Sequence, residues 1–285
     1  MVDVLMAVNL PQTILTQTNM KLLLDLDPIV YRLGFASETK NEDGVVVPDP
    51  IGFCLHSVKV YLKGVYKDTK ATSVRGFLSS SDNFRDKVVP DYKGNRSGFT
   101  KPIHYQAIRD YMVNVFNAEI QYGIEADDRL CLEQTDDTMI ASIDKDLMIC
   151  AGKHYNYVTG EFTDVTPEQG IKNFYGQMLS GDGVDYIAGI KGIGKTKAHK
   201  LLEGTPIADW DDLVMTMYED FHVKALEKMK GFTEEEKLLT KNHDFLAFVR
   251  DGAFGTLVNN SMLLWMLQSN VKMPIDVGRL VGYEV

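Results

Sequence analysis

The chain has 285 residues and is 45% hydrophobic, enough for the core of one large or two small domains. It contains no run of 18 apolar residues, and its first residues include an acid but no basic cluster, so we expect neither a membrane span nor a secretion signal but a cytoplasmic protein. The net charge of −10 argues against a nucleic-acid partner unless the acids are clustered. The three cysteines are far apart in apolar surroundings, which favours reduced, buried thiols over a zinc site or disulfides.

The first half of the chain alternates between strand and helix patterns. "MKLLLDLD" predicts a buried strand ending in acids, and "IVYRLGFA" continues at helical spacing. "ATSVRGFL", "AEIQY" and "DTMIASID" predict further strands, separated by helical stretches such as "YQAIRDYMVNVF", and "HYNYVTGEFTDV" predicts a hairpin at the sheet edge. The order favours an α/β fold with a mostly parallel central sheet flanked by helices.

The pattern becomes purely helical after residue 166. From Pro167 onward, stretches such as "PEQGIKNFYGQMLSG", "TKAHKLLEG" and "TEEEKLLTKNHDFLAFVRDG" predict successive helices separated by glycines. We therefore divide the chain into an α/β region over residues 1–165 and a helical region over residues 166–285. The helical tail after about residue 230 is expected to pack on the core or to form part of a ligand path.

Acidic residues gather where the predicted strands end. Because ligands of parallel sheets bind beyond the carboxyl ends of the strands, these side chains are expected at one edge. Carboxylates this close raise each other's pKa or require cations, and an oxygen-rich set selects Mg²⁺ or Mn²⁺ over zinc. Two such ions can hold a phosphodiester between them, which is typical of nucleases. The acids are Asp25, Glu125, Asp127, Asp128, Asp144, Asp146, Asp182 and Asp185.

The stretch "GIKGIGKT", residues 189–196, matches the Walker A spelling but lacks its context. A phosphate-binding loop of that type follows a buried strand, whereas "SGDGVDYIA" precedes this one. The favoured interpretation is a turn between two helices whose backbone N–H groups face a nucleic-acid phosphate. Nearby lysines would add positive charge, and Ile190 and Ile193 would anchor the turn in a small core. A nucleotide loop and a plain glycine turn remain as alternatives.

A second basic stretch, residues 84–101, interleaves basic and aromatic side chains. Arginine and lysine follow phosphates while aromatic rings stack on unpaired bases, so this composition suits a single strand near a cleft. An ordinary solvated loop explains it equally well. The residues concerned are Arg85, Lys87, Lys93, Arg96 and Lys101, with Phe84, Tyr92 and Phe99.

Taken together, these motifs resemble a known family. "LLLDLDPIVYR", "NFRDKVVPDYKGNR", "GIEADD", "SIDKDL" and "GDGVDYIAGIKGIGKTKAHKLL" occur in the order found in 5′ nucleases. The chain is similar to bacteriophage 5′-to-3′ exonucleases or flap endonucleases, which are related to the 5′ nuclease domain of bacterial DNA polymerase I. The resemblance covers roughly residues 20–205. It implies a PIN-like nuclease core with a helical arch over about residues 84–110 and a helix-hairpin-helix over about residues 181–203.

The resemblance also implies roles for individual residues. The eight acids would bind two Mg²⁺ or Mn²⁺ ions, and Asp25 and Asp144 would be catalytic. Lys93 and Arg96 would contact the scissile phosphate or its neighbours, with Tyr92 near the terminal bases, and a potassium ion would sit in the hairpin turn. The implied DNA-binding residues are Arg85, Tyr92, Lys93, Arg96, Gly189, Lys191, Gly192, Gly194, Lys195, Thr196 and Lys197.

One position departs from the family pattern. Many relatives have an aspartate at the end of the strand before "FR", where this chain has Ser80. The first metal would then be held more weakly, or Asp82 would substitute from a shifted turn. Asp27 could also replace Asp25 as the ligand on the first strand, although the distance of Asp25 to Arg32 fits the family better.

The expected activity is hydrolysis of phosphodiester bonds at 5′ ends, nicks or flaps of DNA, and of RNA primers in RNA/DNA hybrids. The expected protein is a monomer without a membrane partner, located in the host cytoplasm if phage-encoded. Two rivals remain: a non-catalytic, structure-specific DNA-binding protein, and a P-loop nucleotide hydrolase.

Overall fold

A computed structural model describes residues 19–96, 98–233, 243–269 and 271–273. It contains a six-stranded sheet with the order β5-β4-β1-β6-β7-β8. Every neighbouring pair is parallel except β7 and β8, which form an antiparallel hairpin at one edge. The strands are β1 (Lys21–Asp25), β4 (Ser73–Asn83), β5 (Glu119–Gly123), β6 (Thr138–Ala141), β7 (Gly152–Asn156) and β8 (Glu161–Val165). The predicted parallel sheet and its edge hairpin are confirmed.

Strand β1 is central because its side chains are apolar on both faces. Leu22 and Leu24 point into one core and Leu23 into another. This is the continuous apolar run expected of a parallel strand covered on both sides. From β1 the chain proceeds to β4 on one side and later to β6 on the other, so the strand order reverses at β1. The crevice beyond the carboxyl end of β1 is therefore where a ligand is expected.

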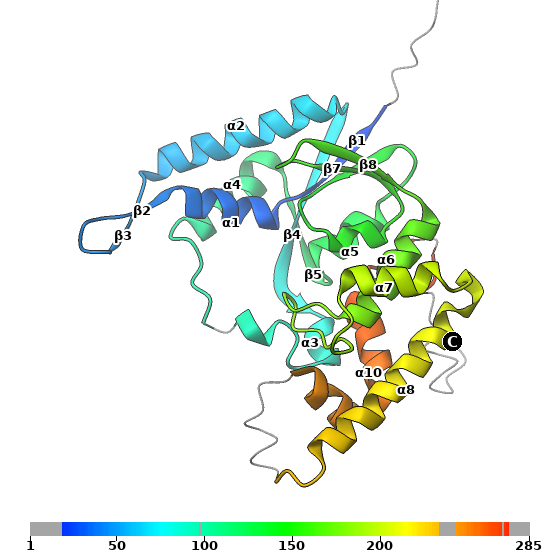
Figure 1. The fold of residues 1–285 in the computed structure, drawn as a ribbon. Helices are drawn as coiled ribbons and strands as arrows, with labels where there is room; N and C mark the ends of the chain where they lie inside the picture. Colours follow the sequence, from blue (N-terminus) through cyan, green and yellow to red (C-terminus); the bar gives the residue numbers. More distant parts are fainter. Residues whose placement is uncertain (1–18, 97, 234–242, 270, 274–285) are drawn as a thin grey trace, which may run out of the picture.

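Helices cover both faces of the sheet (Figure 1). One face packs against α1 (Asp27–Ala36), α2 (Ile51–Thr69) and α4 (Tyr105–Phe116), and a small hairpin of β2 (Glu38–Lys40) and β3 (Val46–Pro48) lies between α1 and α2. The other face packs against α5 (Ala126–Leu132) and the short helix η2 (Asp146–Ile149). The three cysteines are free and buried, as predicted.

The helical half of the described chain has its own core. It contains α6 (Pro167–Ser180), α7 (Lys195–Glu203), η3 (Ile207–Asp209), α8 (Trp210–Met229) and α10 (His243–Leu264), which is broken at Gly252. Helix α6 begins at a capping box of Thr166 and Gln169, with a proline in its first turn. Buried aromatic side chains, including Phe174, fill the core. Part of the helix predicted over residues 233–252 lies outside the described residues.

The segment between β4 and α4 crosses the carboxyl edge of the sheet. It contains two short helical pieces, α3 (Arg85–Val88) and η1 (Gly94–Arg96), and is otherwise irregular in its described residues. This is the segment for which the family resemblance implies an arch. Its position brings its basic side chains next to the ends of β1, β5 and β6.

Candidate active site

A cavity of about 500 Å³ lies at the carboxyl edge of the sheet. Its wall combines acids from several elements with basic and aromatic residues. Six of the eight predicted metal ligands line it: Asp25, Glu125, Asp127, Asp144, Asp146 and Asp185. The predicted convergence of acids that are distant in sequence is therefore present for these six.

Each acid on the sheet side is positioned by a strand end. Asp25 is the last residue of β1 and accepts a 2.6 Å hydrogen bond from the hydroxyl of Ser142, which follows β6. The same hydroxyl accepts a hydrogen bond from the backbone N–H of Asp144. Ser142 thus connects the ends of two neighbouring strands and fixes two of the acids relative to each other.

Helix α5 delivers two further acids from the end of β5. Glu125 is the N-cap of α5 and Asp127 lies in its first turn, where negative charge is favoured by the helix dipole. Asp146 begins η2 in the same way after β6, and the side-chain amide of Gln177 on α6 donates to it. The short loops after parallel strands therefore explain why the cluster forms here.

The remaining acids come from the loop after α6. Asp185 lies in the cavity wall opposite Glu125, whereas Asp182 lines a neighbouring cavity of about 340 Å³ that shares only Asp146 and Gln177 with the first. Asp182 accepts hydrogen bonds from Lys145 at 3.1 Å and from the backbone N–H of Val184 at 2.7 Å.

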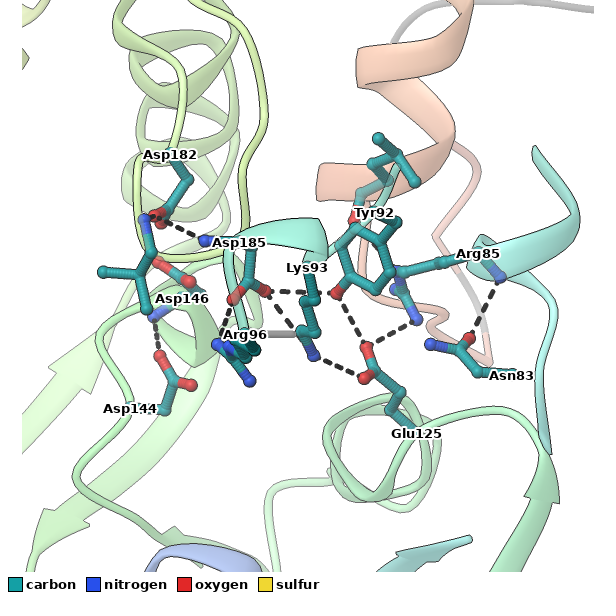
Figure 2. Close-up of polar contacts among 12 residues, drawn as sticks. Asn83, Arg85, Tyr92, Lys93, Arg96, Glu125, Asp144, Asp146, Asp182 and Asp185 are labelled. Carbon is teal, nitrogen blue, oxygen red and sulfur yellow. Dashed lines mark hydrogen bonds and ion pairs between the residues drawn. The ribbon is translucent and has the colours of Figure 1, made fainter. Parts of the chain in front are cut away.

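Basic side chains of the crossing segment fill the space between the acids (Figure 2). The Lys93 ammonium lies 2.5 Å from Glu125 and 3.6 Å from Asp185. Arg96 forms an ion pair with Asp185, and the Tyr92 hydroxyl donates to both Glu125 and Asp185. Lys93 itself has a left-handed backbone (φ 55°), which costs a non-glycine residue free energy.

The carboxylates perturb one another electrostatically. Burial raises the pKa of Asp25 well above the usual value, and repulsion from Asp27 and Asp144 adds to it. Burial likewise raises the pKa of Asp127, with repulsion from Asp25 and Asp144 adding to it. Burial, with repulsion from Asp144 and Asp182, raises the pKa of Asp146 to about 7. Raised carboxylate pKa values are expected where a cluster of acids has too little positive charge nearby.

Asp182 is the exception. Burial alone would raise its pKa, but the N–H of Val184 and the ammonium of Lys145 together hold it below the usual value. The carboxylate charge of Asp182 is therefore already balanced by groups of the protein.

The donor set suits Mg²⁺ or Mn²⁺, because every candidate ligand is a carboxylate oxygen. Within the described residues, however, no three His, Cys, Asp or Glu side chains form a ready-made group for a metal ion. The reason is visible in Figure 2: Glu125 and Asp185 point at Lys93, Tyr92 and Arg96 instead of at a common centre. An ion would have to displace these partners.

Two predicted roles are wrong. Arg85 has no exposed side-chain area, so it cannot contact DNA, and Asp128 is equally buried. The Arg85 guanidinium binds both Asp128 oxygens at 2.6 and 2.8 Å and donates to the backbone carbonyls of Leu263 and Trp265. Asp128 therefore serves as the counter-ion of Arg85 and is not available as a metal ligand.

Two other expectations fail for reasons of exposure. The ring of Tyr92 is buried among the side chains of the helical core, so only its hydroxyl reaches the acids and the ring is not available to stack on bases. Asp82 does not substitute in the cavity. It lies in an irregular stretch of β4 between Ser79 and Asn83, its side chain is 55% exposed, and it faces Lys87 at 3.5 Å.

Residues 189–196 lie at the end of a loop between α6 and α7, and Lys195 and Thr196 belong to α7. No strand precedes this stretch among the neighbouring described residues, so the P-loop interpretation is wrong. Ile190 and Ile193 are buried in the helical core, as predicted. Gly189 and Gly192 shape the turn: a Cβ at Gly189 would lie 2.2 Å from a backbone oxygen, and Gly192 has a φ of 86°.

The basic residues of this region are exposed: Lys191, Lys195, Lys197 and Lys200.

The sequence analysis did not identify three side chains that bind acids of this region. Arg109 on α4 is buried and donates to Asp27 and to the backbone of Ser79, Gln177 donates to Asp146, and Lys145 bridges to Asp182. Arg109 sits beside Ile108, on the buried side of an amphipathic helix. An arginine at such a position was the available signal, because buried charges require partners.

Comparison with solved structures identifies the fold as that of 5′ nucleases. One bacteriophage T5 5′-exonuclease structure, described with divalent metal ions (zinc) bound, has a TM-score of 0.50 at 15% identity and covers 85% of this chain and 89% of its own. A T5 structure described as co-crystallised with metal ions has a TM-score of 0.52 at 15% identity and covers 86% and 95%.

The bacteriophage T5 flap endonuclease in a complex with DNA and metal ions has a TM-score of 0.51 at 17% identity, over 86% of this chain and 99% of its own. At these identities the likeness establishes the fold. No protein-family model matches the chain. None of the helices in the described ranges is both long and apolar enough to cross a membrane.

Proposed function

We propose that the protein is a divalent-metal-dependent 5′ nuclease that hydrolyses DNA at 5′ ends, nicks or flaps. The observation that carries the proposal is the cavity lined by six carboxylates, two of which pair with Lys93 and Arg96. An all-oxygen set of acids selects Mg²⁺ or Mn²⁺, and the two basic residues between these acids match a phosphodiester. The names of the solved T5 proteins, which include exonuclease, flap endonuclease, DNA and metal ions, support the same activity.

Each wall of the cavity has a separate task in this proposal. Asp25, Glu125, Asp127 and Asp144 would hold two divalent ions, which would polarise the scissile phosphate and the attacking water. Lys93 and Arg96 exchange their carboxylate partners for phosphate oxygens, which orients the substrate next to the acids. No covalent intermediate with the protein is required, since water is the nucleophile.

The loop before α7 serves as the duplex grip. Lys191 in this loop and Lys195, Lys197 and Lys200 on α7 are exposed next to a turn whose glycines allow close approach of a sugar-phosphate backbone. We further propose that a potassium ion binds in this turn and that RNA in RNA/DNA hybrids is also a substrate. We also propose that the protein is a monomer located in the cytoplasm. Binding through this loop is expected to weaken steeply with salt, because each phosphate contact releases counterions.

The proposal is tested with labelled 5′-flap, nicked and blunt DNA, with Mg²⁺ or with a chelator. Cleavage is expected only with the metal, and Asp144→Asn is expected to abolish it while flap binding persists in a gel-shift measurement. Val158→Ala, on the exposed turn between β7 and β8 and outside the cavity wall, serves as the control variant. Flap binding without cleavage under any divalent ion would instead identify a non-catalytic DNA-binding protein, a candidate that Ser80 favours because it removes one expected ligand.

A further inference from the structure

The family resemblance implies an aspartate where this chain has Ser80, so the acidic wall has one carboxylate fewer than expected. The structure shows which acid lies next to this position. In the register of β1 and β4, Asp25 is paired with Phe77. Two residues after each member of this pair, Asp27 lies beside Ser79. The Asp27 carboxylate accepts a 2.8 Å hydrogen bond from the backbone N–H of Ser79. Asp27, the first residue of α1, therefore reaches the part of β4 where the family resemblance implies an acid.

The Asp27 side chain also belongs to the cavity. Asp25, Asp27, Ser79, Ser80 and Asp127 all line it. The backbone N–H of Asp27 donates to Asp25 at 3.2 Å, and the hydroxyl of Ser79 accepts the N–H of Ala126 immediately before Asp127. Short hydrogen-bonded paths thus connect Asp27 to the acids on either side of it.

Ser80 and Asp82 are turned to each other. The Ser80 hydroxyl and the Asp82 backbone exchange hydrogen bonds of 3.1 and 3.2 Å within the irregular stretch of β4. The Asp82 carboxylate faces Lys87 outside the cavity. No acid of β4 is thus directed at the metal site, which leaves Asp27 as the carboxylate at this position.

Arg109 holds Asp27 in place. Its guanidinium donates to Asp27 at 3.0 Å and to the Ser79 carbonyl at 2.7 Å, and its side chain is only 10% exposed. The Asp27 carboxylate accepts one hydrogen bond from Arg109 and one from the backbone N–H of Ser79. Because a carboxylate has about four lone-pair positions, these two bonds leave oxygen capacity for an ion. The Asp27 side chain is 26% exposed toward the cavity that contains Asp25 and Asp127.

We propose that Asp27, positioned by Arg109 and Ser79, replaces the absent β4 aspartate as a ligand of the divalent ion nearest to Asp25. The proposal rests on the nuclease function above, and it assigns a ligand set particular to this chain. Moving a carboxylate from β4 to the start of α1 keeps the number of acids around the ion. It also makes Arg109 a positioning residue, because removing its guanidinium would free the Asp27 side chain to rotate.

A relocation experiment tests the proposal without measuring cleavage. Mn²⁺ binding is followed by the electron paramagnetic resonance signal of free Mn²⁺ for four proteins: the natural chain, Asp27→Asn, Asp27→Asn with Ser80→Asp, and Asp82→Asn. Asp27→Asn is expected to weaken one Mn²⁺ site by at least about 10-fold. Ser80→Asp is expected to restore that site to within about threefold of the natural chain, because it returns a carboxylate to β4. Asp82→Asn is expected to have no effect.

The outcomes are distinguishable. Unchanged Mn²⁺ binding in Asp27→Asn overturns the proposal, since Arg109 would then merely neutralise Asp27. Weakened binding that Ser80→Asp does not restore also overturns it, because the effect would be structural. Thermal unfolding of each metal-free variant verifies that it is folded. If the natural chain binds no Mn²⁺ at all, the proposed nuclease function fails as well, whereas the first two results leave that function in place.

Discussion

The ion pairs of Lys93 lead to a counter-intuitive prediction: removing this lysine should strengthen metal binding in the absence of DNA. The Lys93 ammonium lies 2.5 Å from Glu125 and 3.6 Å from Asp185, and its side chain is 24% exposed. A divalent ion such as Mg²⁺ that binds Glu125 at about 2.0–2.1 Å must replace this ammonium. A hydrogen bond between charged groups contributes about 1.5–3 kcal/mol, so Lys93→Met should tighten Mn²⁺ binding by about 10- to 150-fold.

The assay is a calorimetric titration of the DNA-free protein with Mn²⁺. Lys93→Arg should bind like the natural chain because it keeps the competing charge. Lys87→Met is the matched control: it removes one positive charge from the same segment, but Lys87 pairs with Asp82 outside the cavity. Equal or weaker Mn²⁺ binding by Lys93→Met would refute the reasoning, and so would an equal gain in Lys87→Met.

The pH dependence, the buried ion pair and the glycine loop give three further predictions. The pKa of Asp146 is raised to about 7, so between about pH 4 and 7 the folded metal-free protein binds more protons than the unfolded chain. Its stability should therefore fall as the pH rises from about 4 through 7. Thermal unfolding at a series of pH values measures this fall, which Mg²⁺ should reduce. Breaking the buried pair by Arg85→Met should cost about 3–5 kcal/mol in urea unfolding, and the additional change Asp128→Leu should recover part of this loss; a loss below 1 kcal/mol would contradict the burial argument. Gly189→Ala should destabilise the protein by about 1–3 kcal/mol, because its Cβ would collide with backbone, while Gly183→Ala, with open space around it, should not; equal unfolding midpoints would contradict this.

Much of the acidic wall could be predicted because it depends on strand ends. Asp25, Asp127 and Asp144 follow apolar runs, and parallel strands bring such positions to one edge. The spacing of the buried residues Cys54, Val58 and Leu62 is likewise typical of a helix, so α2 was within reach of the same reasoning.

The roles of individual charges could not be predicted in the same way. In the sequence, Arg85 and Asp128 look like the basic and acidic residues around them. Their joint burial is explained only by the carbonyls of Leu263 and Trp265, which lie 178 and 180 positions after Arg85. The presence of Ser80 in place of the expected aspartate was visible from the sequence. The contact of Asp27 with Ser79, however, depends on the register between β1 and β4. Pairing partners distant in sequence are a property of the fold and leave no local pattern.

The bonds of Arg85 have a consequence for the order in which the protein matures during synthesis. The carbonyls of Leu263 and Trp265 lie near the C-terminal end of the described chain, yet they satisfy a side chain next to the acids. Contacts between such distant positions form late, because a long loop must close first. A nascent chain that has not yet emerged past Trp265 still lacks two of the acceptors of Arg85, so the cleft acquires its final shape only after residue 265 has left the ribosome.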